Sequence, residues 1–199
     1  MALSQPHIQP EPTLFERPQP QPGEWTYDDY CAIPDDGNRY EVIDGELYMT
    51  PGPIPANQYV VVMLTYFLVG HIRLHDLGRL YSAPMDVVLS LRNVVQPDLL
   101  FIRAERLSIV GPKNITAGPD LAVEVLSPGT RNYDRRRKAE TYAAHDVQFL
   151  WLVDPATRTV EEFQLRDGVY ELVQQRAGDD AFAPIVFPGL TIALSELWE

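Results

Sequence analysis

The chain has 199 residues, of which 45 % are hydrophobic and 22 % charged, so its length and composition suit one globular domain with a sizeable core. Its formal net charge is −12, from 16 basic and 28 acidic residues, and this excess repels nucleic acid at long range. The one cysteine, Cys31, excludes an internal disulfide and a cluster of zinc-binding cysteines, and it fits a reducing compartment.

A proline-rich segment opens the chain, with six prolines in residues 1–23. Proline removes backbone donors and disfavours helix and sheet, so we expect a disordered or extended tail over 1–23 and a folded domain over 24–199. A proline-binding partner could use this tail. The first residues lack the basic start and apolar run of a signal peptide, and the most apolar stretch, 59–69, is shorter than the roughly 20 residues of a membrane-spanning helix. We therefore expect no membrane partner and a cytoplasmic location.

The folded part begins with a short helix, expected at 25–32. The segment YEVIDGELYM then alternates apolar and polar residues around Asp44-Gly45, which is typical of a two-residue hairpin. The apolar stretch at 56–76 predicts a long buried helix.

Strands dominate the rest of the chain. Residues 84–91 and 99–103 predict strands, and the β-branched run DLAVEVL predicts a buried one. A polar helix, capped by Thr130, is expected at 130–145. FLWLVD predicts another buried strand, and TVEEFQL and VYELVQ flank an Asp-Gly pair in a second hairpin. Mixed strands with few helices favour an α/β or α+β fold with a mixed β-sheet.

Two carboxylates stand out by their context. Asp98 follows a proline and opens the apolar run LLFI, and Glu124 lies inside DLAVEVL, where a charge is costly unless it is paired or binds a metal. Alternation along the strand turns Glu124 away from the leucine and valine face, which leaves open whether it is solvated, pairs with an arginine or binds an ion. Asp120 is about 13 Å along the strand from Glu124, too far for the two carboxylates to share one ion. We therefore expect Asp120 to be a strand-start or turn residue.

A basic run follows this strand. Residues 131–138 carry five basic residues and one aspartate, a local charge of +4 that leaves −16 for the rest of the chain. A basic helix start beside a buried carboxylate suits a phosphate. The alternative is a solvated helix face on which Asp134 and Lys138, four residues apart, pair for about 0.3–0.5 kcal/mol. Spacing alone favours the solvated face.

The order of these segments resembles the Uma family of endonucleases, bacterial proteins of the restriction-endonuclease-like PD-(D/E)xK superfamily. The resemblance runs from about Tyr27 to the C-terminus. It rests on YEVIDGELYMTPGP, QPDLLFI and the long block GPDLAVEVLSPGTRNYDRRRKAETYAAHDVQFLWLVDP. It implies a restriction-endonuclease-like core, a mixed β-sheet flanked by helices.

The resemblance also implies an active site. By position, Asp98 matches the first acid and Glu124 the second, and together they would bind Mg²⁺, with Mn²⁺ as an alternative. The lysine of the superfamily pattern belongs two residues after Glu124, where this chain has Leu126. In the Uma-like subgroup that lysine is on the following helix, and Lys138 is the matching residue. Glu41 matches a further acidic position near the site.

The function implied is a Mg²⁺-dependent endonuclease that hydrolyses phosphodiester bonds of DNA, with Lys138 orienting the attacking water or stabilising the developing charge. We expect Lys138→Ala to abolish cleavage while folding stays nearly intact. The alternative is a catalytically inactive nuclease-fold protein that binds nucleic acid or a protein partner, which the net charge and Leu126 favour. A third interpretation is an interaction protein acting through its tail. Cutting both strands needs two sites, so a homodimer is expected.

Overall fold

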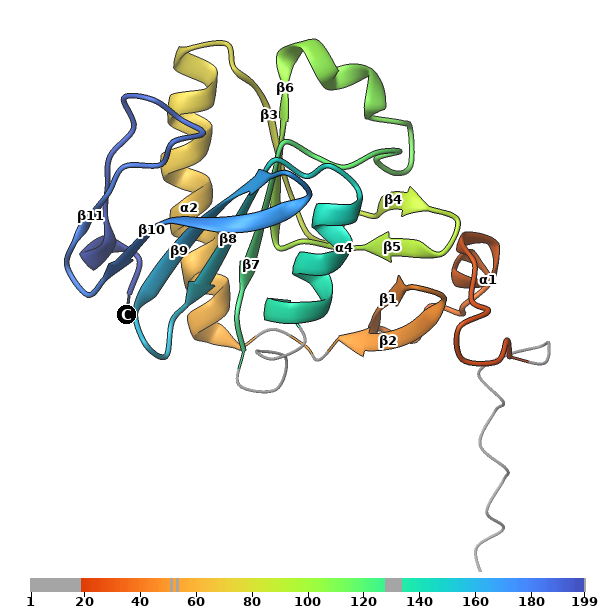
Figure 1. Cartoon of the computed structure of the whole chain (residues 1–199). Coiled ribbons are helices and arrows are strands. Elements are labelled where there is room, and N and C mark those ends of the chain that lie inside the picture. Colours follow the sequence, from red (N-terminus) through yellow and green to blue (C-terminus); the bar gives the residue numbers. More distant parts are fainter. Residues whose placement is uncertain (1–18, 51, 53, 128–133, 199) are drawn as a thin grey trace, which may run out of the picture.

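A six-stranded mixed sheet in the order β10-β9-β8-β7-β6-β3 forms the centre of the fold (Figure 1). Its strands are β3 (Gly78–Ser82), β6 (Leu99–Arg103), β7 (Leu121–Val125), β8 (Phe149–Asp154), β9 (Thr159–Arg166) and β10 (Val169–Ala177). β7 and β8 are parallel and the other neighbours antiparallel, which confirms the expected mixed sheet. The computed structural model describes residues 19–50, 52, 54–127 and 134–198.

A smaller four-stranded sheet, in the order β2-β1-β5-β4, lies beside the central one. Its strands are β1 (Arg39–Ile43), β2 (Glu46–Thr50), β4 (Val87–Ser90) and β5 (Asn93–Val95). The turn between β1 and β2 has positive φ at both Asp44 (53°) and Gly45 (77°), the backbone of a type I′ turn. This hairpin and the one between β9 and β10 are both confirmed.

Helix α2 (Pro55–Leu74) covers one face of the central sheet. Its core side is spaced at every fourth residue and packs on apolar residues of β6, β7 and β8. That side consists of Val60, Leu64, Leu68 and Ile72. The expected packing of this helix on one face of the sheet is confirmed, but the helix is buried on one side only, since the opposite side exposes Val62 (61 %) and Tyr66 (70 %). The sequence concealed this because its outward positions are also apolar.

The other face of the sheet carries a π-helical turn (Asp134–Lys138) that continues into α4 (Ala139–Ala144). Tyr142 of α4 is fully buried against the sheet. The expected helix at 130–145 thus has its C-terminal part here, whereas its proposed Thr130 cap lies outside the described residues. In the described part of the chain, no helix is long and apolar enough to span a membrane.

The remaining elements are short. Helix α1 (Tyr27–Cys31) starts with a capping box in which Thr26 and Asp29 bind each other's backbone N–H. Among the described residues, the other elements are two 3₁₀ turns (Ala104–Ile109 and Leu194–Glu196) and the pair β11 (Ala181–Phe182) and β12 (Ile192–Ala193).

Some expectations about the elements need correction. The strand expected at 84–91 spans only β4, and β3, β5, β11 and β12 were not expected, because segments of two to five residues leave little periodic signal. Of the proline-rich tail, residues 1–18 lie outside the described residues, so the boundary at residue 23 stays a prediction.

Candidate active site

The two carboxylates singled out by the sequence come from neighbouring antiparallel strands. Leu99 pairs with Val123, which puts Asp98, the residue before β6, level with Glu124 of β7. The backbone N–H of Val125 donates to Asp98 Oδ2 at 2.8 Å, so the Asp98 carboxylate is fixed beside the end of β7. The structure therefore brings the two acids to the same end of the central sheet.

Asp98 is partly buried and belongs to a charged neighbourhood. Its Oδ1 is 3.8 Å from Arg39 Nη1. Burial raises the pKa of Asp98 above its ordinary value, while the Val125 N–H and the charges of Lys138 and Arg39 act in the opposite direction. The negative charge of Glu41 adds to the increase. Asp98 thus lies within electrostatic range of Glu41 and Lys138, and its ionised form lacks the solvation it would have in water.

A buried cluster of charges forms at the same end of β7. Lys138 Nζ lies 2.9 Å from Glu41 Oε1 and 3.0 Å from Glu124 Oε2, and none of these three side chains is more than 4 % exposed. Tyr142 OH donates to Glu124 Oε1 at 2.6 Å, and the Gln96 N–H donates to Glu41 Oε1 at 2.7 Å. We call Glu41, Glu124 and Lys138 the Lys138 cluster. β1, β7 and the π-helical turn each contribute one of its members.

One acid of the Lys138 cluster has an oxygen that lacks a donor. Glu41 and Glu124 both contact the Lys138 ammonium, and Glu41 Oε2 is buried without a hydrogen-bond partner among the described residues. A buried carboxylate oxygen without a donor is costly, because it loses its hydration and gains nothing in return. A cation at this point would satisfy it.

The donor chemistry fits Mg²⁺ held by few protein ligands. Asp98, Glu124 and Glu41 offer hard oxygen donors, which Mg²⁺ prefers. In the part of the chain that the structure describes, no group of three or more His, Cys, Asp or Glu side chains is arranged to hold an ion, so a cage of protein ligands is not preformed there. Mg²⁺ does not need one, since it usually keeps several waters and one or two carboxylates.

The basic run divides its side chains among different environments. Arg136 is 83 % exposed, with Nε 3.6 Å from Glu140 Oε1. Arg137 Nη1 is 2.9 Å from Glu46 Oε2 and also contacts Tyr48 OH. Lys138 turns inward. The alternative of a solvated face therefore describes Arg136, whereas Lys138 is buried beside Glu124. A π-helical turn, a feature frequent at functional sites, contains Arg136, Arg137 and Lys138.

Asp120 lies at the opposite end of β7. Its Oδ2 accepts from the Arg103 N–H at 2.9 Å, and its Oδ1 is 3.0 Å from Arg106 Nη1. It lies just before β7 begins, as expected for a strand-start residue.

Sequence reasoning missed residues that shape the site. Asn57 of α2 donates from Nδ2 to the carbonyl oxygens of Val125 (3.0 Å) and Leu126 (3.3 Å), which ties the helix to the end of β7. Arg39 reaches Asp98 from β1. No local pattern marks these residues, because their partners are far away along the chain. Tyr142 did leave a signal, since it follows Lys138 by four residues and so shares its helix face.

Comparison with known proteins places this geometry in context. The Uma2 family model, described as "Putative restriction endonuclease", matches residues 27–195. A crystal structure described as that of a putative nuclease belonging to DUF820 from Anabaena variabilis is similar, with a TM-score of 0.72 at 19 % identity. The match covers 86 % of this chain and 96 % of that one, which shows a shared fold. No curated protein matches the chain.

Proposed function

The chain belongs to the Uma2 family, and from this premise we propose that it is a Mg²⁺-dependent endonuclease that hydrolyses phosphodiester bonds of DNA. The observation that carries the proposal is the buried Lys138, shared by Glu41 and Glu124 next to Asp98. Acidic oxygens beside a buried ammonium suit a reaction in which a metal-bound phosphate gains negative charge.

The metal would be held at the end of β7. Asp98 and Glu124 are the proposed ligands of Mg²⁺ or Mn²⁺, and Glu41 would direct its unpartnered Oε2 to a second ion or to a water of the first. When bound, the ion polarises the phosphate and lowers the pKa of the attacking water.

The chain's own residues would orient the reaction. Lys138, charged and fixed between two carboxylates, would orient the water and stabilise the developing charge on the phosphate. Tyr142 holds Glu124 through its hydroxyl, and the Val125 N–H holds Asp98. Such supporting hydrogen bonds keep ligands in position before the metal arrives.

Leu126 stands where the general superfamily pattern has its lysine. It is 3 % exposed and packs in the apolar cluster under α4. The ammonium of Lys138 reaches Glu124 from the following helical segment instead. This geometry supports the proposal that Lys138 replaces the lysine missing from the strand.

The direct test is nicking of supercoiled plasmid by the purified full chain. We expect nicking with Mg²⁺ or Mn²⁺ and none with EDTA, and loss of both nicking and metal binding in Glu124→Ala. Nicking that persists in EDTA, or that is unchanged in Glu124→Ala, would refute the proposal.

A second candidate function is an inactive nuclease-fold protein that binds nucleic acid or a protein partner. The net charge of −12 weakens attraction to DNA, which favours this candidate over an endonuclease and, within it, a protein partner over nucleic acid. This candidate predicts salt-sensitive DNA binding without cleavage.

Light scattering would test the proposed homodimer. Removal of residues 1–23 would test whether residues 24–199 fold and nick DNA without the tail.

A further inference from the structure

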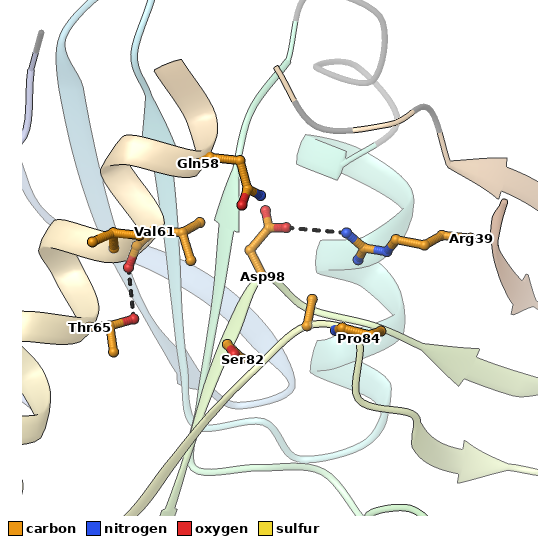
Figure 2. A pocket seen from close by; sticks show the side chains of 9 residues that line it. Arg39, Gln58, Val61, Thr65, Ser82, Pro84 and Asp98 are labelled. Atoms are coloured by element: carbon orange, nitrogen blue, oxygen red, sulfur yellow. Dashed lines mark hydrogen bonds and ion pairs between the residues drawn. The ribbon is translucent and has the colours of Figure 1, made fainter. Parts of the chain in front are cut away.

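A cavity of about 500 Å³ opens beside Asp98, on the side of the site that faces α2 (Figure 2). Its volume is within the range of about 300–1,000 Å³ that is common for small-molecule sites. Its apolar lining comes from Val61 and Val62 of α2 and from Ala83 and Pro84 after β3. Arg39, Gln58 and Asp98 form the part of the lining that meets the candidate active site.

Arg39 and Gln58 point toward the Asp98 carboxylate from opposite sides in Figure 2. Among the described residues that line the cavity, Arg39 is the one basic residue. Gln96 holds its guanidinium, since Arg39 Nε donates to Gln96 Oε1 at 3.1 Å and Nη2 donates to the Gln96 carbonyl oxygen at 2.9 Å. Nη1 faces Asp98 at 3.8 Å, beyond hydrogen-bond distance. The cavity thus offers one oriented cation, whose Nη1 faces Asp98 and makes no hydrogen bond with the described residues.

We propose that this cavity receives the base and sugar of one unpaired nucleotide while Arg39 binds its phosphate beside Asp98. The apolar side chains from α2 and from the segment after β3 suit the faces of a base, Gln58 suits its polar edge, and a single guanidinium suits a single phosphate. The inference rests on the proposed function, because it assigns the cavity to the substrate of the same site.

The substrate class follows from this assignment. A base paired within a duplex cannot enter a side pocket unless it leaves the stack, which costs a few kcal/mol. A chain with a net charge of −12 also gains little affinity from contacts with many successive phosphates of DNA. The cavity therefore selects DNA whose nucleotide next to the cut is unpaired, in a single strand, a bulge or a loop.

Binding tests the cavity independently of catalysis. Calorimetry with each of the four deoxynucleoside 5′-monophosphates should show binding of at least one of them to the full chain. Ser82→Trp and Gln58→Trp, which fill the cavity from its two sides, should each weaken that binding by about tenfold or more. The matched control is Tyr66→Trp, an exposed position of α2 outside the cavity lining. It should bind as the wild type does.

Hydrolysis then separates the two proposals. With Mn²⁺, the p-nitrophenyl ester of thymidine 5′-monophosphate should have a KM at least about tenfold below that of bis(p-nitrophenyl) phosphate, which lacks a nucleoside. Either filled variant should remove this preference, and Tyr66→Trp should retain it. Nucleotide binding without any hydrolysis would support the cavity and refute the endonuclease. Absent nucleotide binding, or equal KM values for the two esters, would overturn the cavity proposal while leaving the endonuclease standing.

Discussion

Asp120, the residue before β7, and Glu124 near the other end of that strand are each only 3 % exposed, yet their surroundings differ. Asp120 has two arginines whose side chains are 44 % and 34 % exposed, and a backbone N–H. Glu124 shares one buried lysine with Glu41, whose Oε2 has no hydrogen-bond partner in the described part of the structure. Burial alone does not mark a catalytic carboxylate. A buried ammonium shared by two acids, with the Glu41 Oε2 atom left without a donor among the described residues, distinguishes the candidate site from the structural ion pair.

The largest difference between the two ends of β7 should appear when each loses a cation. Lys138→Ala should lower the nicking rate by at least about 10²–10³-fold, because a buried charge that stabilises the transition state is lost. It should also cost about 3–5 kcal/mol of unfolding free energy, since Glu41 and Glu124 lose their partner. This revises the expectation of nearly intact folding. Plasmid nicking and urea denaturation measure both effects.

Arg106→Ala is the matched control at the other end. It should cost less than about 1 kcal/mol, because Arg106 is partly exposed and Arg103 still pairs with Asp120. Nicking should not change in Arg106→Ala.

Mg²⁺ should raise the Tm of Lys138→Ala more than that of the wild type, since the bound cation replaces the lost ammonium beside Glu41 and Glu124. Full activity in Lys138→Ala would remove this lysine from the mechanism.

Neutral substitutions of the acids sharpen the comparison. Glu124→Gln should reduce Mn²⁺ affinity by more than about tenfold and abolish nicking, with little loss of stability because Glu41 keeps Lys138 paired. Asp120→Asn should do the reverse, with unchanged nicking and a cost of about 1–3 kcal/mol from the two arginines it leaves behind. Calorimetry and thermal melts of the two variants measure these values. The comparison fails if Asp120→Asn loses metal binding as Glu124→Gln does.

Asp98 should show a trade-off between stability and activity. Burial raises its pKa, so its ionised form at neutral pH costs folding free energy that a neutral side chain would not. In EDTA at neutral pH, Asp98→Asn should therefore raise Tm by about 2–4 °C, the effect of roughly 1 kcal/mol in a chain of this length. With metal present, it should lose nicking. A lower Tm in EDTA would mean that the ion pair between Asp98 and Arg39 stabilises the folded chain by more than the burial of the ionised carboxylate destabilises it.

The smallest effect is expected on the surface of the basic run. Arg136→Ala should change stability by a few tenths of a kcal/mol at most, because its contact with Glu140 is exposed. DNA binding should weaken by a few-fold, and the salt dependence should fall by about one phosphate contact. Fluorescence anisotropy at several salt concentrations measures this. If Arg136→Ala lost as much stability or nicking as Lys138→Ala does, the division of the basic run into an exposed and a buried part would be contradicted.

Much of the fold could be predicted from the sequence. Asp44-Gly45 marks a turn because both positions need positive φ, and Glu124 stands out because a charge interrupts an apolar strand. These are local signals. The alternation along β7 also indicated the face to which Glu124 belongs.

The assembly of the site could not be predicted in this way. Spacing alone favoured a surface position for Lys138, and only the family resemblance indicated an inward one. Arg39 and Asn57 escaped notice because tertiary packing brings them to Asp98 and to the end of β7. Local periodicity records which face a residue occupies, but not which distant residues will meet it there.

The central claim is that the acids beside Lys138 bind a catalytic metal, and a crystal of the full chain soaked in Mn²⁺ tests it most directly. The account predicts an anomalous peak about 2.1 Å from carboxylate oxygens of both Asp98 and Glu124, with Lys138 beside it. A crystal with no peak at this end of β7, or with Lys138 still bridging Glu41 and Glu124 and manganese bound elsewhere, would contradict it.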